Sequence, residues 1–231
     1  MKLYIEANIG AGKTTFINKL EKYFNSSDNI ICLREPVEEW INLKDSKGDN
    51  ILNYFYSNQE RWSYTFQMNA FMTRIQSINN NCKKNKINFI ERSIYTDKNC
   101  FALLCKENNS INDIEWSLYE NWFKWLNNKF DVEPTGYIYI KTTPETCYER
   151  IKKRNREEEK SIPLEYLKQL NDKHEIWMEK EKGNNNVLVI DGGENFEDDE
   201  MVFFKILKAI ELFINNLKNK EITSNLKLDA Y

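Results

Sequence analysis

The turn between the first predicted strand and the first predicted helix constrains this chain more than any other feature. The apolar run Leu3–Ile5 has the length of a buried strand. Phe16, Ile17 and Leu20 then recur at helical spacing. The turn between them is rich in small residues, which let backbone N–H groups converge on phosphate oxygens, and the helix N-terminus adds partial positive charge. This order predicts a phosphate-binding loop; a chance glycine turn before a helix is the alternative.

The residues of this loop suggest individual roles. Lys13 can reach the outer phosphates of a nucleotide, and the Thr14 hydroxyl can hold Mg²⁺. Ala7 stands where the pattern usually has its first glycine, and its methyl group is tolerable there if its φ is negative. The candidate phosphate-binding residues of the loop are Asn8, Ile9, Gly10, Ala11, Gly12, Lys13, Thr14 and Thr15.

Strand-like apolar runs alternate with longer segments of helical periodicity along the chain. Strands are predicted at Leu3–Ile5, Ile30–Leu33, Ile87–Ile90, Tyr137–Ile140 and Val187–Ile190. Helices are predicted at about residues 14–25, 60–84, 94–107, 112–129, 144–154, 164–181 and 197–217. This alternation predicts an α/β fold with a five-stranded parallel sheet between helices, and ligands at the carboxyl ends of its strands.

Length and composition bound the class of protein. We expect the 231 residues to form one domain over 1–220 and a C-terminal tail, 221–231, that frays. A net charge of −3 argues against a nucleic-acid-binding protein, since those carry a basic excess. The five cysteines include no CxxC pair, which indicates reduced thiols. The sequence contains no apolar run of about 18 residues, the length that a membrane span needs. We therefore expect a cytoplasmic protein, or a mitochondrial one if a leader has been removed.

The single histidine excludes several chemistries. His174 lies in the helical stretch 164–182, where we expect it to make a local hydrogen bond. With His174 as the single histidine, inside a helical stretch, a Ser-His-Asp triad or a histidine-rich metal site is disfavoured. Acid–base work must fall to carboxylates.

Charged residues follow two of the predicted strands. Glu35, before Pro36, follows the second strand, and Glu91 and Arg92 follow the third. Taken singly, such residues are usually surface ion pairs. At the strand ends beside a phosphate loop, they form a set suited to phosphoryl transfer. Glu35 is the candidate general base, Arg92 the candidate anion clamp, and Glu91 a direct or water-mediated partner of Mg²⁺.

A basic and then acidic segment joins two predicted helices. Arg150, Arg154 and Arg156 precede a run of glutamates, and Pro163 lies near the start of the next helix. The segment is either a solvated charged turn or a mobile lid, at about residues 154–161, whose arginines close on phosphates.

These segments and several others occur in the order and at the spacing of the motifs of a known enzyme family. They are Ala7–Thr15, Glu35–Val37 with Trp40, Glu60–Gln67, Glu91–Asp97, the lid, and Ile162–Leu167 running to His174 and Glu175. From the first strand to about Phe196, the chain resembles the deoxyribonucleoside kinases, in particular the deoxycytidine, deoxyguanosine and deoxyadenosine kinase branch. The resemblance implies a P-loop kinase fold and Mg²⁺-dependent transfer of the γ-phosphate of ATP, or another nucleoside triphosphate, to the 5′-hydroxyl of a deoxyribonucleoside. It also implies a homodimer that pairs through long helices.

The resemblance also assigns roles to individual residues. Glu35 accepts the 5′-hydroxyl proton beside Arg92, while Tyr56 and Glu159 bind the sugar 3′-hydroxyl. Gln67 reads the base, because its amide can donate and accept at once. The apolar slot around the base consists of Trp40, Leu52, Phe66 and Phe101, although Leu52 and Phe66 also suit a purely core role. The lid cations are Arg150, Arg154 and Arg156, and the segment near the donor's base contains Glu194, Asn195 and Phe196.

Substrate choice within this resemblance depends on Arg74 and Asp97. Arg74 lies seven residues after Gln67, two helical turns on, and so faces the same pocket. A guanidinium held by Asp97 fills the space that a thymine 5-methyl group needs, and it offers donors to purine N7 or O6. We therefore expect purine deoxynucleosides and deoxycytidine to be preferred over thymidine.

Two other functions share parts of the pattern. A nucleoside monophosphate kinase of the thymidylate type has a phosphate loop and a lid, but it needs additional cations for the acceptor phosphate. A non-catalytic member of the family keeps the fold and a binding role. A GTPase switch is disfavoured, because no Asn-Lys-x-Asp segment follows a late strand.

Overall fold

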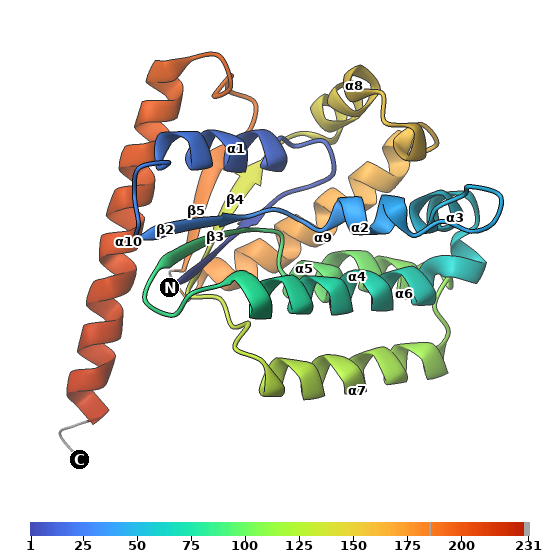
Figure 1. The fold of residues 1–231 in the computed structure, drawn as a ribbon, viewed down its shortest axis with the longest axis horizontal. Coiled ribbons are helices and arrows are strands. Elements are labelled where there is room, and N and C mark those ends of the chain that lie inside the picture. The colour runs from blue at the N-terminus through green and yellow to red at the C-terminus, as the bar shows by residue number, and fades with distance from the viewer. Residues whose placement is uncertain (185, 229–231) are drawn as a thin grey trace.

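A computed structural model describes residues 1–184 and 186–228, and the side chains of 1–184 and 186–220. Its centre is a five-stranded, all-parallel sheet with the strand order β2-β3-β1-β4-β5 (Figure 1). The strands are β1 (Lys2–Glu6), β2 (Ile30–Leu33), β3 (Ile87–Glu91), β4 (Gly136–Lys141) and β5 (Val187–Asp191). The predicted α/β class and parallel sheet are confirmed.

The helices form the layers around this sheet. They are α1 (Lys13–Tyr23), α2 (Val37–Asn42), α3 (Ile51–Ser57), α4 (Gln59–Asn81), α5 (Ile94–Thr96), α6 (Leu103–Glu107), α7 (Asp113–Lys129), α8 (Pro144–Arg154), α9 (Leu164–Lys182) and α10 (Glu200–Leu228). A π-helical segment, η1 (Asp97–Ala102), and a short 3₁₀ turn, η2 (Glu157–Glu159), complete the chain.

Side-chain contacts assign these helices to the two faces of the sheet. On one face, the Phe24 ring after α1 stacks on Phe89 of β3 at 6.2 Å, and α10 approaches Gly136 of β4 closely. A Cβ atom on Gly136 would lie 2.9 Å from side-chain atoms of Phe213 and Leu217. On the other face α9 packs, with the Trp177 ring centre 5.3 Å from that of Tyr137 in β4, and α7 forms an outer layer against α4 (Figure 1).

Three helical regions differ from the sequence prediction. The helix expected over 94–107 is divided by η1, a wider turn of the kind that often occurs at functional sites. Helices α2 and α3 were not predicted, although Asn50 and Asn53 form a capping box at the start of α3. Helix α10 continues to Leu228, past the end predicted at 217. Of the segment predicted as a tail, 229–231 lie outside the described residues.

The structure also bears on the predictions made for His174, the cysteines and membrane-spanning segments. His174 is fully buried, and its Nδ1 lies 2.7 Å from the carbonyl oxygen of Leu170, so the expected local hydrogen bond is present. All five cysteines are free. No helix among the described residues combines the length and apolar character that a membrane span needs.

Candidate active site

The sheet order brings the predicted chemistry together. Strands β2, β3 and β1 are neighbours, so Glu35, the Glu91–Arg92 pair and the phosphate loop lie at adjacent carboxyl ends. These strand ends border a cavity of about 1050 Å³ that extends from the phosphate loop to an aromatic slot between α2, α3 and α4. Parallel α/β folds place ligands at this edge of the sheet.

The phosphate loop has the backbone conformation that its glycines allow. Gly10 and Gly12 have φ values of +77° and +100°, and a Cβ on Gly10 would lie 2.5 Å from the carbonyl oxygen of Cys147. The φ of Ala7 is not positive. Its methyl group therefore meets the condition stated above for replacing the usual first glycine of the loop. The loop therefore keeps its shape without the first glycine.

Lys13 is folded back across this loop. Its Nζ donates to the carbonyl oxygens of Ala7 at 3.1 Å and Asn8 at 2.8 Å. Burial and, second, the positive charge of Arg92 lower the pKa of Lys13 to about 7, although the carboxylates of Glu35 and Glu91 act in the opposite direction. A buried amine of this kind is ready to take up charge when an anion arrives.

Two residues of the loop lie behind it. The Asn8 side chain donates to the Leu167 carbonyl of α9 at 2.8 Å and accepts from the Ile9 amide at 2.8 Å. Asn8 and Ala11 do not line the cavity, whereas the other predicted loop residues do. Asn8 thus anchors the loop to α9.

Thr14 and Glu91 bring two oxygen atoms together beside the phosphate loop. The Thr14 hydroxyl donates to Glu91 Oε1 at 2.7 Å, and both residues line the cavity. Hydroxyl and carboxylate oxygens are ligands that suit Mg²⁺. The pair fits that ion in chemistry and in position, directly beside the phosphate loop.

A buried charge cluster, consisting of Glu35, Arg74, Arg92 and Asp97, occupies the middle of the cavity. Arg74 donates to both carboxylate oxygens of Asp97, at 2.8 and 3.0 Å, and to Glu35 at 2.9 Å. Arg92 Nε lies 3.2 Å from the same oxygen of Glu35. Burial opposes ionisation of Glu35, but the two guanidinium groups outweigh it and lower its pKa to about 2.

Several donors in this region have no partner within the described protein. The Nη1 atoms of Arg74 and Arg92 and the Nε2 atom of Gln67 are buried without a hydrogen bond. Buried donors in native proteins are nearly always satisfied, so unpartnered ones beside a cavity indicate where a ligand binds. They mark a ligand that offers acceptor atoms to both the cluster and Gln67.

The conformation of Arg92 is held from β1. Arg92 has a φ of +64°, and the next residue, Ser93, donates its amide to the fully buried Glu6 at 3.0 Å. Thr96 also bonds to Glu6. The Arg92 guanidinium lies 4.6 Å from the centre of the Phe101 ring. Strained backbone at such a position is maintained by its surroundings and clusters at active sites.

Aromatic rings line the far end of the cavity. Phe66 meets Trp40 edge to face at 5.4 Å and stacks on Phe55 at 4.6 Å. Leu52 and Phe101 also line this slot, as predicted, whereas Phe55 was missed. The spacing of Leu52 and Phe55, three residues apart after the Asn50 cap, is the sequence signal that points to it.

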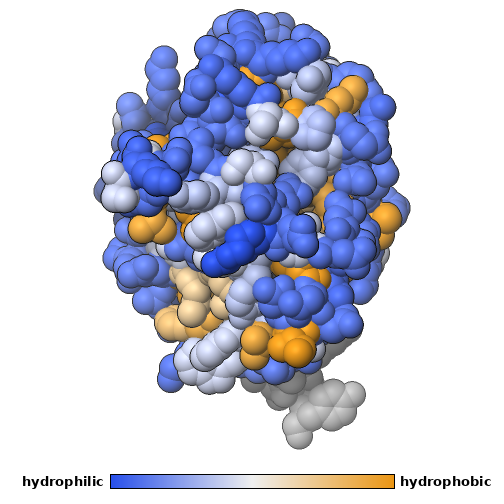
Figure 2. Space-filling model, turned by 90° about the vertical axis from the view of Figure 1, so that its right-hand side faces the viewer, coloured by the Kyte–Doolittle hydropathy of each residue, from blue (hydrophilic) through white to orange (hydrophobic). Residues whose placement is uncertain are grey.

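The lid lies at the end of the cavity that Tyr56 and Glu159 line. Glu159 accepts from Arg156 at 3.0 Å and from Arg154. Burial and the charge of Glu159 raise the pKa of Tyr56, which keeps its hydroxyl neutral. Glu158 accepts from Asn50 at 2.7 Å, so the lid touches the start of α3. The surface around α3 and the lid is largely hydrophilic (Figure 2).

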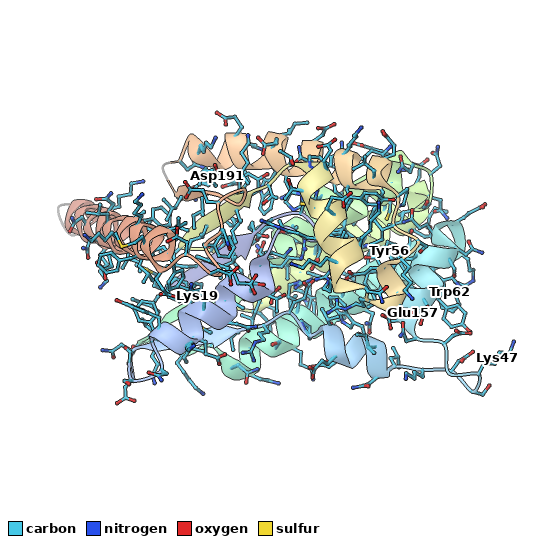
Figure 3. The ribbon with its side chains drawn as sticks, turned by 90° about the horizontal axis from the view of Figure 1, so that it is seen from above. Lys19, Lys47, Tyr56, Trp62, Glu157 and Asp191 are labelled. Atoms are coloured by element: carbon cyan, nitrogen blue, oxygen red, sulfur yellow. The ribbon has the colours of Figure 1, made fainter. Side chains whose placement is uncertain are left out.

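The remaining predicted residues lie at the opposite end. Arg150 lines the cavity beside Glu194, Asn195 and Phe196, and the Phe196 ring packs edge to face on Phe16 at 5.5 Å. Tyr56 and Glu157 lie far from Asp191 along the molecule (Figure 3). Residues that the sequence analysis did not predict also line the cavity: Arg34, Pro36, Val37, Glu38, Glu39, Phe55, Ala70, Ser77, Lys153, Glu197 and Asp198.

Comparison with known proteins agrees with this geometry. Residues 3–215 match the family described as deoxynucleoside kinase. A probable deoxycytidine kinase of fowlpox virus (strain NVSL) is 39% identical over 94% of this chain and 89% of its own length. Deoxycytidine kinase 2 of Gallus gallus is 35% identical, covering 93% and 91%, and a mitochondrial deoxyguanosine kinase of Xenopus laevis is 32% identical, covering 94% and 90%.

The comparisons favour a kinase of nucleosides over a nucleoside monophosphate kinase or a non-catalytic relative. The roles given above to single residues remain predictions, although the cavity brings together all of them except Asn8 and Ala11. The chain belongs to the deoxynucleoside kinase family and is an enzyme that transfers phosphate from ATP to deoxynucleosides.

Proposed function

We propose that this kinase phosphorylates deoxycytidine and purine deoxynucleosides in preference to thymidine. The buried Arg74–Asp97 pair beside Gln67 is the observation that carries the proposal. The names of the chicken, fowlpox virus and frog relatives, which are deoxycytidine and deoxyguanosine kinases, support it.

The pair acts on the base by shape and by hydrogen bonding. Arg74 is 2% exposed, and two bonds to Asp97 fix its guanidinium in place, so it cannot move aside for a 5-methyl group. The unpartnered Nη1 of Arg74 is available to purine N7 or O6. The unpartnered Nε2 of Gln67 can donate to cytosine N3 or adenine N1, while its carbonyl accepts from the exocyclic amine.

Glu35 is proposed to hold and deprotonate the 5′-hydroxyl. Because the pKa of Glu35 is about 2, it is ionised at every physiological pH and accepts the hydroxyl hydrogen bond. So weak a base takes the proton late, once bonding to phosphorus has made the hydroxyl acidic, which suits a loose transition state. Arg92, 3.2 Å from Glu35, is placed to neutralise the migrating phosphoryl group.

Thr14 and Glu91 are the residues proposed to hold Mg²⁺. When bound, the ion neutralises charge on the β- and γ-phosphates. We also propose that the donor's base lies against Glu194–Phe196 beside Arg150, and that Arg154 and Arg156 reach its phosphates from the lid, because all of these residues line the cavity.

A homodimer is also proposed, with α7 as its contact surface. Ile114, Leu118, Trp122 and Trp125 recur at intervals of four, four and three residues and are all exposed, Trp125 by 55%. Such a stripe on an outer helix suits a symmetric pairing with a second copy of this chain. Trp122→Glu with Trp125→Glu should produce a monomer in analytical ultracentrifugation, whereas an unchanged sedimentation coefficient would contradict the proposal.

The compartment is proposed to be the cytoplasm. The five free cysteines suit a reducing environment.

Phosphate transfer from Mg²⁺-ATP to each of the four deoxynucleosides, with thymidine monophosphate alongside, tests the proposed reaction. We expect turnover of deoxycytidine or a purine deoxynucleoside at a kcat/KM at least about tenfold above that of thymidine. Turnover of the monophosphate alone, or of thymidine above the others, would overturn it.

A further inference from the structure

We propose that Lys19, outside the cavity, is a positioning residue that holds the donor-base segment (residues 192–199) in its binding shape. The inference rests on the proposed function, because it takes this segment to be the donor's base site. Lys19 does not line the cavity, so it acts through the backbone that it holds.

The donor-base segment needs such support because of its composition. It begins with Gly192 and Gly193 and then carries four carboxylates in six residues, 194–199 being Glu-Asn-Phe-Glu-Asp-Asp, and Glu200 follows at the start of α10. Most of its residues are exposed, and it has no regular secondary structure beyond turns. Its acidic groups repel one another and also repel the phosphates of a donor.

Lys19 makes contacts with four residues of this region and its adjoining helix. Its Nζ donates to the carbonyl oxygens of Phe196 at 2.8 Å and Glu197 at 2.7 Å, and it pairs with Glu200 at 3.0 Å. The same ammonium lies 4.7 Å from the centre of the Phe203 ring. Lys19 is thus satisfied entirely by the donor-base segment and the first turn of α10, and its side chain is only 15% exposed.

The residue that Lys19 holds is the one that meets the phosphate loop. The Phe196 ring packs on Phe16, and a Cβ on Gly12 would lie 3.2 Å from its Cζ atom. Fixing the carbonyls of Phe196 and Glu197 therefore fixes where the segment approaches the loop, and with it the positions of Glu194 and Asn195 at the cavity. In Figure 3, Lys19 lies on the side of α1 that faces α10, away from Tyr56 at the nucleoside end.

This arrangement predicts an effect confined to the donor. Lys19→Met keeps the aliphatic stem but removes the ammonium, and we expect the KM for ATP and the Kd for ADP to rise about tenfold, which corresponds to about 1.4 kcal/mol. The KM for the nucleoside should stay within about twofold, and Lys19→Arg, which keeps charge and donors, should recover most of the donor affinity.

The matched control is Lys22→Met. Lys22 lies one turn further along α1, is exposed and carries the same charge, so its loss should leave both KM values unchanged. Hydrogen exchange of the amides in 192–199 gives a second readout: it should be faster in Lys19→Met than in the wild type and in the control.

These measurements separate the inference from the proposed function. If the wild-type chain does not phosphorylate a nucleoside, the proposed function fails, but ADP titration and hydrogen exchange still test Lys19. An unchanged ADP affinity in Lys19→Met, or equal losses in kcat and both KM values, would overturn the inference. If Lys19→Met does not fold, Lys19→Gln replaces it, with an expected rise in ADP Kd of at least about threefold.

Discussion

The two ends of the active site are built differently. At the nucleoside end, the charges are paired inside the protein: the side chains of Arg74 and Arg92 are 2% and 5% exposed. The lid cations Arg154 and Arg156, which we propose bind the donor's phosphates, are 37% and 33% exposed, and the donor-base segment is held by Lys19 from a neighbouring helix. The proposed nucleoside site is therefore formed in the free protein, whereas the proposed donor site depends on surface segments.

Burial explains this difference in rigidity. A buried ion pair that loses one partner leaves an uncompensated charge, so its geometry is strongly maintained. An exposed pair contributes little and exchanges partners easily. We propose that selectivity for the nucleoside resides in the buried charge cluster, and that the lid and the donor-base segment control binding of the triphosphate.

The largest effect should come from Glu35. Glu35→Gln keeps the shape but removes the carboxylate that faces both arginines, and we expect kcat to fall by about 10²- to 10⁴-fold. The KM for the nucleoside should change far less, because Gln67 and the aromatic slot are untouched. Steady-state kinetics with saturating ATP measures the split, and a loss below about tenfold would exclude Glu35 as the base.

The second-largest effect should come from the Arg74–Asp97 pair, where two variants distinguish its contribution to stability from its contribution to nucleoside selectivity. Arg74→Met alone leaves Asp97 buried without its partner, and we expect the free energy of unfolding to fall by about 3–5 kcal/mol in urea denaturation. The double variant Arg74→Met/Asp97→Ala should be more stable than that single variant and should turn over thymidine. Negligible thymidine turnover in a folded double variant would contradict the steric explanation.

A smaller effect is expected at the junction of the two ends, where the pKa of Lys13 is about 7. Phosphate oxygens raise this pKa, so the complex holds a proton that the free enzyme lacks at pH 8. ADP binding should take up about 0.9 proton there, and ADP affinity should fall as pH rises above 7. Calorimetry in buffers of different ionisation enthalpy measures the uptake. Lys13→Arg, which does not titrate, should show none, and zero uptake by the wild type would contradict the lowered pKa.

The smallest effect is expected at Ala7. Its φ is not positive and its side chain is fully buried, so Ala7→Gly removes a methyl group that already fits. The KM values for ATP and for the nucleoside should both stay within about twofold. A clear fall in the KM for ATP would show that the methyl group distorts the donor end.

Local sequence patterns were sufficient to predict the sheet and the placement of charged residues at its strand ends. The phosphate loop and Glu35 follow apolar runs of distinctive length, and parallel strands bring their ends together. Helices α2 and α3 have six and seven residues, too few for periodicity to distinguish them, so Phe55 was missed with α3.

The features of the site that the sequence did not predict are mainly contacts between elements that lie far apart in the chain. The resemblance suggested the Arg74–Asp97 pair, but the bond from Arg74 to Glu35 depends on how α4 approaches the end of β2. The contacts of Lys19 depend likewise on the return of the chain after β5, 177 residues later at Phe196. No local pattern encodes either distance.

Binding of deoxycytidine and thymidine by isothermal titration calorimetry, without any nucleotide present, tests most directly whether the buried cluster selects the nucleoside by itself. We expect deoxycytidine to bind the free enzyme at least about tenfold more tightly than thymidine. Equal affinities, or no binding of deoxycytidine until ADP is added, would show that selectivity is assembled with the donor and would contradict this account.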